Sequence, residues 1–453
     1  MNVHELIEMQ RRTMTEAGPR SVSERVDQLD MLHTAIRQRE NILCDALRSD
    51  LGKSAGEAYL AEIGPVLGDL SYIIRHLKRW ARPKRVLSPL AFFPGRSYIL
   101  KEPYGVALIM APWHYPFLLS LSPLIGALAA GNHCVLKPSA YAPATAQAVA
   151  GLVSACFPPE QAAVVTGGRE ESQALMEERY DYIFFTGGVE AGKRVLEMAA
   201  KHVTPVTLAL GGKSPCIVDD SADLAAAARR IALGKALNAG QSSVAPDYLL
   251  VQEKVKDALL SRIRACWEQF YGDPFNSLQW PRMIDGRHYQ RVMRLMDGEQ
   301  VYCGGVGDGQ RIAPTLLTDV SWDAPIMQTE VFGPVLPVIS FLDVDEIIPK
   351  IKEREKPLAL YLFTRKASVR EKVLRQVPFG GGCVNDTVIQ PVNPRLPFGG
   401  VGQSGLGKYH GKYSFDTFTH EKAVVIRKNF PDLPARFPPF TEGKDGITRL
   451  FMR

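Results

Sequence analysis

A chain of 453 residues is too long for one compact core and predicts two or three domains. Its composition, 46% hydrophobic and 23% charged, is ordinary for a soluble globular protein and excludes a fibrous or disordered chain. The net charge of +6 is spread along the sequence, apart from a basic run at 78–85. Such a short run is more typical of a solvated or subunit-contact segment than of a nucleic-acid-binding patch, so we expect no nucleic-acid partner.

The seven cysteines are isolated, and no pair has the spacing of a zinc site or a disulfide framework. This usage fits a reducing compartment. The first residues are too polar for a signal peptide, and no run of 18 apolar residues is present. We therefore expect a cytoplasmic protein with no metal site and no membrane span.

In chain order, apolar spacing predicts helices over 2–17, 22–51 and 57–80. Residues 82–102 combine prolines and glycines with β-forming residues and are interpreted as an extended arm. From 105 onward, expected strands at 106–110, 134–136, 162–165 and 182–185 alternate with helices at 117–130, 143–155 and 193–201. This succession predicts a parallel, doubly wound sheet, with ligands bound beyond the carboxyl ends of its strands.

A second α/β unit is expected from about 208, with helices near 222–238 and 252–270 and strands at 248–251 and 335–341. A late strand pair over 413–428 is similar to the arm at 82–102. The last segment, 431–453, is rich in proline and aromatic residues and is expected on the surface.

Three local motifs suggest a nucleotide site. A glycine-containing strand-to-helix turn, with Gly187, Gly188 and Gly192, would allow a phosphate to approach the backbone at a helix N-terminus. Lys137 follows an expected strand and could reach a ribose or phosphate, although a surface lysine explains it equally well. Glu330 lies two residues before Phe332 and could bind a ribose diol, or the segment could be a simple turn.

Taken together, the motifs have an order and spacing that resemble the aldehyde dehydrogenase superfamily, most closely its class 3 branch, which acts on fatty and aromatic aldehydes. The resemblance extends from the first helix to about residue 430. It rests on the segments 50–54, 62–66, 137–139, 185–187, 210–213, 238–241, 330–334, 396–400, 402–405 and 409–412.

This resemblance implies an aldehyde dehydrogenase-like α/β fold. Residues 1–81 and 103–208 would form a Rossmann-type nicotinamide-binding domain and 209–400 the catalytic-type domain. Residues 82–102 and 410–430 would form a β-arm that joins a homodimer. In the family, a cysteine thiolate attacks the aldehyde, hydride passes to NAD(P), and a glutamate base promotes hydrolysis while an asparagine holds the oxyanion.

The departures from the family pattern fall on that chemistry. Ser243 stands where the resemblance places the thiolate, Ala209 where it places the general base, and His114 where it places the oxyanion amide. Ala140 replaces a carboxylate that would hold the adenosine ribose, which permits NADP as well as NAD and is also compatible with weak binding. The implied cofactor contacts that remain are Trp113, Lys137, Gly187, Gly188, Gly192, Glu330 and Phe332.

Four functions stay open for such a site. The first is an NAD(P)-dependent oxidoreductase of non-standard, reductive chemistry, with His114 as proton donor. The second is a non-catalytic protein that binds nucleotide, ligand or partner. The third is acyl transfer or hydrolysis by a Ser243–His114 dyad, and the fourth is weak residual aldehyde oxidation. Ser243 and His114 could also be plain structural residues, and the apolar residues around 113–118 suggest an apolar or aromatic substrate.

Overall fold

The computed structural model describes residues 2–89, 92, 94–430 and 434–451. Its N-terminal half is built on a six-stranded sheet, parallel except for one edge strand, in the order β15-β7-β6-β3-β4-β5. The strands are β3 (Val106–Met110), β4 (His133–Lys137), β5 (Ala162–Val164), β6 (Tyr182–Gly187), β7 (Val206–Leu210) and β15 (Gly405–Leu406). The expected α/β class with a parallel, Rossmann-type sheet is confirmed.

Helices cover this sheet because its central strands are buried on both faces, which parallel sheets require. They are α6 (Pro116–Ala130), α7 (Pro143–Cys156), α8 (Arg169–Glu177) and α9 (Val189–Ala200). Strand β3 lies between β4 and β6, so the residues that follow these three strands meet at one edge of the sheet. Trp113, Lys137 and Gly187 all belong to that edge, where ligands of doubly wound folds bind.

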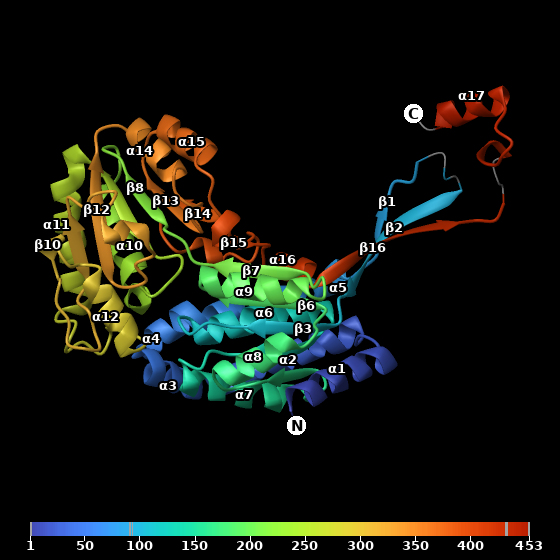
Figure 1. Cartoon of the computed structure of the whole chain (residues 1–453), viewed down its shortest axis with the longest axis horizontal. Helices are drawn as coiled ribbons and strands as arrows, with labels where there is room; N and C mark the ends of the chain where they lie inside the picture. Colours follow the sequence, from blue (N-terminus) through green and yellow to red (C-terminus); the bar gives the residue numbers. More distant parts are fainter. Residues whose placement is uncertain (1, 90–91, 93, 431–433, 452–453) are drawn as a thin grey trace.

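A second, seven-stranded sheet has the order β10-β11-β12-β9-β8-β13-β14, with only β10 antiparallel to its neighbour. Its strands are β8 (Pro215–Val218), β9 (Tyr248–Gln252), β10 (Gln300–Cys303), β11 (Thr315–Thr318), β12 (Val335–Phe341), β13 (Ala359–Phe363) and β14 (Gly381–Val384). The helices of this unit are α10 (Leu224–Ala236), α11 (Lys256–Tyr271), α12 (Gly286–Arg294), α13 (Pro325–Gln328), α14 (Val344–Lys352) and α15 (Ala367–Gln376). The two sheets form separate lobes of one body (Figure 1).

The N-terminal helices are more divided than their apolar spacing predicts. They are α1 (Val3–Ala17), α2 (Val22–Gln38), α3 (Glu40–Leu51), α4 (Ala55–Ala58) and α5 (Gly64–Trp80). The single helix expected over 22–51 is interrupted at Arg39, and the one over 57–80 contains a π-helical turn, η1 (Tyr59–Ile63). A π turn shifts the helical register, and this one contains the buried Glu62.

The arm is a three-stranded antiparallel sheet of β1 (Lys84–Val86), β2 (Gly95–Pro103) and β16 (Thr419–Arg427), which projects from the body (Figure 1). The strand expected from 413 was wrong at its start, because α16 (Lys412–Thr417) is a helix. Its Ser414 and Phe415, together with Phe418, are buried, so packing on the body overrides strand formation there.

The tail contains the helix α17 (Glu442–Phe451), which lies beyond the arm (Figure 1). Residues 431–433 and 452–453 of the expected surface tail lie outside the described residues. The remaining short helical turns are η3 (Leu237–Gly240), η4 (Glu253–Val255), η5 (Gln390–Val392), η6 (Gly402–Ser404) and η7 (Pro434–Arg436). None of the described helices is both long and apolar enough to cross a membrane.

Candidate functional site

An apolar cavity of about 240 Å³ lies where the two lobes meet. His114, Ala209 and Ser243 all line it, although they come from the turn after β3, from β7 and from the loop after η3. The tertiary structure therefore brings together the three positions that the sequence singles out. Ala209 belongs to the six-stranded sheet, since β7 continues to Leu210, past the expected domain boundary at 208.

The loop that carries Ser243 is shaped by three consecutive residues with positive φ. Asn238, Ala239 and Gly240 have φ values of 54°, 50° and 68°, a conformation that non-glycine residues adopt at a cost of order 1–3 kcal/mol each. Only glycine fits at 240, because a Cβ atom there would lie 2.2 Å from the carbonyl oxygen of Gly333. The bend directs Ser242 and Ser243 toward the cavity.

Side-chain hydrogen bonds compensate for this strained bend. The Asn238 side-chain amide donates to the carbonyl oxygens of His114, at 2.5 Å, and of Gln241, at 2.8 Å. The Asn238 backbone N–H donates to the buried Glu57 carboxylate at 2.6 Å. Asn238 thus holds the Ser243 loop and the His114 turn in fixed relation, which makes it a positioning residue of the site.

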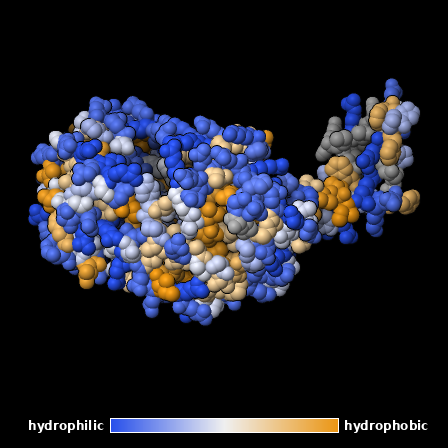
Figure 2. Space-filling model, turned by 60° about the horizontal axis from the view of Figure 1, so that its bottom comes forward, coloured by the Kyte–Doolittle hydropathy of each residue, from blue (hydrophilic) through white to orange (hydrophobic). Residues whose placement is uncertain are grey.

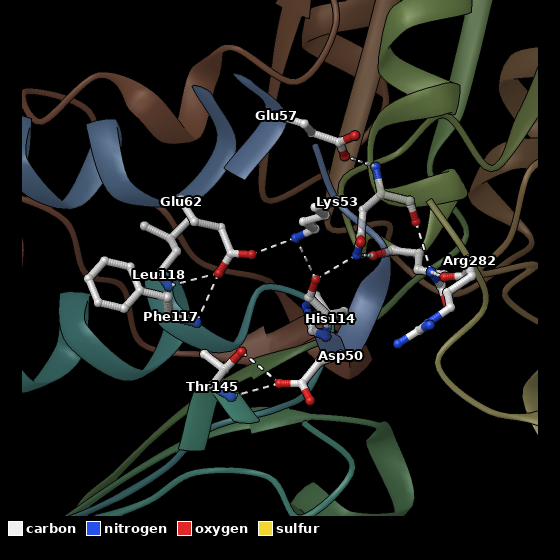
Figure 3. A network of polar contacts seen from close by, with 11 residues as sticks. Asp50, Lys53, Glu57, Glu62, His114, Phe117, Leu118, Thr145 and Arg282 are labelled. Atoms are coloured by element: carbon white, nitrogen blue, oxygen red, sulfur yellow. Dashed lines mark hydrogen bonds and ion pairs between the residues drawn. The ribbon is translucent and has the colours of Figure 1, made fainter. Parts of the chain in front are cut away.

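A fully buried ion pair contacts the same turn (Figure 3). The Lys53 ammonium lies 2.5 Å from Glu62 and donates to the His114 carbonyl oxygen at 3.3 Å. The second oxygen of Glu62 accepts from the backbone N–H groups of Phe117 and Leu118, the free donors at the start of α6. No role was predicted from the sequence for Lys53, Glu57 or Glu62. Lys53 and Glu62 fall within the motifs at 50–54 and 62–66, whereas Glu57 falls in neither.

The His114 imidazole is neutral in this setting. Burial, and then the nearby Lys53 ammonium, lower its pKa to about 3. Its ring makes edge-to-face contacts with Phe332, at 5.1 Å between centroids, and with Trp113, at 6.0 Å. Within the described part of the chain neither ring nitrogen has a hydrogen-bond partner, and no hydrogen bond joins the imidazole to Ser243. A neutral imidazole can donate one hydrogen bond to a ligand.

The depressed pKa of His114 predicts a loss of stability in acid. An unfolded histidine has a pKa near 6.5, so below about pH 6.5 the unfolded chain takes up a proton that the folded chain refuses. This costs about 2 kcal/mol of unfolding free energy at pH 5. Urea unfolding measures how far the free energy of unfolding falls between pH 7 and pH 5. We expect this fall to be about 2 kcal/mol smaller in His114→Asn than in the unmodified protein.

The exposed His202→Asn should leave this pH-dependent loss unchanged. An equal fall in the free energy of unfolding in His114→Asn and in the unmodified protein would show that the folded protein does not hold the His114 imidazole neutral.

A second cavity, of about 330 Å³, shares the wall formed by His114, Thr186, Ala209 and Ser243 with the first. Glu330 lines it with one carboxylate oxygen that is buried and has no partner among the described residues. Burial, and then the nearby Asp247, raise the pKa of this carboxyl to about 8. An unsatisfied buried carboxylate oxygen is costly, and a ribose hydroxyl would satisfy it. Trp113, Gly187, Gly188 and Phe332 also line this cavity.

The remaining expected cofactor residues lie along the same edge of the sheet. Lys137 is buried, not a surface lysine, and donates to the carbonyl oxygens of Gly167 and Pro138 at 2.7 and 2.8 Å. Gly192 lets α9 pack closely against β7, because a Cβ atom at this position would lie only 2.7 Å from the Leu210 side chain. Ala140 is exposed and lies three residues after the end of β4.

Comparison with known proteins agrees with this architecture. The model of the aldehyde dehydrogenase family matches residues 1–424. The chain belongs to the aldehyde dehydrogenase family. It is 44% identical over 439 residues to the 4,4'-diaponeurosporen-aldehyde dehydrogenase of Staphylococcus aureus, covering 96% of this chain and 95% of the relative. It is 40% identical to the dimeric NADP-preferring aldehyde dehydrogenase of dog, covering 96% and 98%.

Solved aldehyde dehydrogenase structures show the same arrangement. The substrate-bound Staphylococcus aureus AldH aligns over 100% of both chains with a TM-score of 0.97 and 42% sequence identity. An indole-3-acetaldehyde dehydrogenase in complex with NAD+ aligns over 94% of this chain and 88% of its own, with a TM-score of 0.86 and 26% identity. This family member has His114, Ala209 and Ser243 in the wall between its two cavities.

Proposed function

We propose that this aldehyde dehydrogenase family member uses NAD(P)H to reduce a carbonyl group of an apolar ligand, and that it has lost the family's thiol-dependent aldehyde oxidation. The observation that carries the proposal is the shared wall of the two cavities. There, a ligand in the apolar cavity would meet a nicotinamide across His114, Thr186, Ala209 and Ser243. None of these four supplies a thiolate or a carboxylate base.

The residues present fit a nicotinamide cofactor. The unpartnered Glu330 oxygen suits the hydroxyls of a ribose, and Phe332 and Trp113 supply apolar walls. The glycines at 187 and 188 precede the N-terminus of α9, where positive helix-dipole charge favours phosphate. A carboxylate at position 140 would repel the 2′-phosphate of NADP. Because Ala140 has none, the site would admit NADP as well as NAD.

When bound, a reduced nicotinamide supplies hydride. The protein's part is then to position and polarise the carbonyl group, a task for which no covalent nucleophile is needed. The neutral His114 N–H would donate a hydrogen bond to the carbonyl oxygen, as a buried histidine of lowered pKa does in triosephosphate isomerase. The carbonyl carbon gains the hydride, the oxygen gains a proton from His114 that water replaces, and an alcohol leaves.

The same geometry bears on two alternative functions. A Ser243–His114 dyad needs a basic imidazole, whereas the lowered pKa of His114 makes it a poor base and no hydrogen bond joins the pair among the described residues. Binding of nucleotide and ligand without turnover is the second candidate. It is favoured by the absence of any acidic side chain or thiol in the shared wall.

The test measures oxidation of NADH and NADPH by straight-chain and aromatic aldehydes. We expect turnover that falls about 10²–10³-fold in His114→Phe, the loss typical of one oxyanion donor. Glu330→Gln should weaken NAD(P)H binding about 10-fold, whereas the exposed Glu353→Gln should not. Nucleotide binding without turnover of any carbonyl compound would favour the binding protein, and no binding at all would overturn both.

We further propose a homodimer joined through the arm. Apolar side chains gather on the arm, which stands clear of the body (Figure 2). Val425 and Ile426 of β16 are more than half exposed, at 54% and 59%, as expected of a strand that a partner subunit would cover.

A further inference from the structure

The apolar cavity has polar side chains along one wall. Ala61, Pro65 and Asp69 lie four residues apart, so they form one stripe along η1 and α5. Leu118 and Ser122 form a matching stripe on α6. Both stripes are apolar at first and end in a polar residue, Asp69 and Ser122, and both of these polar residues line the cavity.

Asp69 and Ser122 lie away from His114 in the wall that the two cavities share. Glu62 contacts the first turn of α6, so the two stripes start side by side. They run in the same direction, because Asp69 contacts Gly411 just before α16, and α16 also packs on α6. Asp69 is seven residues beyond Glu62, which places it roughly 10 Å further along the helix axis. His114, just before α6, therefore lies at the Glu62 end of the two stripes, whereas Asp69 and Ser122 lie at their other end.

Asp69 and Ser122 are buried and incompletely satisfied. Asp69 is 6% exposed and Ser122 is 1% exposed. One Asp69 oxygen accepts from the Gly411 N–H at 3.2 Å, whereas the other has no partner among the described residues. The Ser122 hydroxyl also lacks a partner there. Buried groups of this kind are usually satisfied, so a hydrogen-bonding group that enters the cavity would complete both.

The charges around the cavity indicate which group that is. Its lining includes the carboxyls of Asp69 and Asp386 and no lysine or arginine. The two lining histidines, His114 and His410, are both held neutral because burial lowers their pKa values, to about 3 and about 4. The lining therefore offers no positively charged partner to a carboxylate, whereas the open Asp69 oxygen can accept from a hydrogen-bond donor.

We propose that Asp69 and Ser122 form a subsite for a hydrogen-bond-donating group, a hydroxyl or an ammonium, at the far end of a long apolar ligand. The proposal deepens the proposed function, on which it rests for the position of the carbonyl group. The ligand would have a carbonyl group near His114 and its second polar group roughly 10 Å away. Leu60, Ile389 and Val392, which are 62%, 54% and 57% exposed, give the cavity an apolar mouth.

The test is a binding titration without nucleotide, so it does not depend on turnover. The probes are four primary alcohols of equal chain length whose other end is a methyl, hydroxyl, ammonium or carboxylate group. We expect the hydroxyl or the ammonium probe to bind at least about 10-fold more tightly than the methyl probe, and the carboxylate probe to bind most weakly. Whichever of the two binds more tightly identifies the class of the ligand.

Asp69→Asn and Ser122→Ala should each reduce the preference for the hydroxyl or ammonium probe over the methyl probe. Asp219→Asn is the matched control, because Asp219 is equally buried, has partners for both oxygens and does not line the cavity. If Asp69→Asn fails to fold, Ser122→Ala decides the question. Equal or tighter binding of the methyl probe, or a preference that survives both substitutions, would overturn the subsite. A preference without carbonyl reduction would remove the proposed function and leave the subsite standing.

Discussion

Introducing a thiol, a carboxylate and an amide at three positions is expected to give aldehyde oxidation at least about 10³-fold faster than in the unmodified protein. The triple variant is Ser243→Cys, Ala209→Glu and His114→Asn. The three side chains line one cavity, so the new groups would face the same carbonyl. A cysteine provides thiolate at neutral pH, which an unassisted serine does not. The measurement is reduction of NAD(P)+ by an apolar aldehyde.

Two controls separate chemistry from folding. Ser242→Cys, placed in the same background of Ala209→Glu and His114→Asn, puts a thiol one residue away and should remain slow. The background alone, with Ser243 kept, should also remain slow because it lacks a nucleophile. If the triple variant binds NAD(P)+ and yet oxidises aldehydes no faster than the unmodified protein, the proposal that His114, Ala209 and Ser243 prevent aldehyde oxidation is wrong.

Replacing Lys53 with methionine is expected to lower the free energy of unfolding by about 3–5 kcal/mol, the usual cost of removing one partner of a buried ion pair. Lys53 and Glu62 are both 0% exposed, so Lys53→Met leaves the Glu62 carboxylate buried without its counter-charge. The ammonium is also lost from the face of the Tyr115 ring, 4.2 Å away. Urea unfolding at neutral pH measures the change.

The double variant Lys53→Met with Glu62→Gln should recover part of the lost stability, since the buried charge is then removed as well. Lys193→Met, which breaks an exposed ion pair with Glu190, should show no measurable effect. A loss in Lys53→Met no larger than in Lys193→Met would contradict the role assigned to this pair.

Local motifs in the sequence were sufficient to predict the family, the parallel sheet and the edge at which Trp113, Lys137 and Gly187 gather. Each of these rests on a local requirement of the backbone, such as a glycine at a tight turn or a ligand-binding turn after a buried strand. The residue types at 114, 209 and 243 could also be read from the sequence, because a residue's identity at a motif position needs no coordinates.

The tertiary structure alone decided how those positions behave. Glu57 accepts a hydrogen bond from Asn238, 181 residues away in the sequence, and Asp69 accepts one from Gly411, 342 residues away. No local sequence pattern could predict either contact. The neutral state of His114 and the unsatisfied oxygens of Glu330 and Asp69 follow from burial, which depends on what the other lobe covers. Residues 412–417 fold as a helix for the same reason, since their side chains pack on the body. Residue types therefore determined which side chains stand at the motif positions, and long-range packing determined the surroundings in which those side chains act.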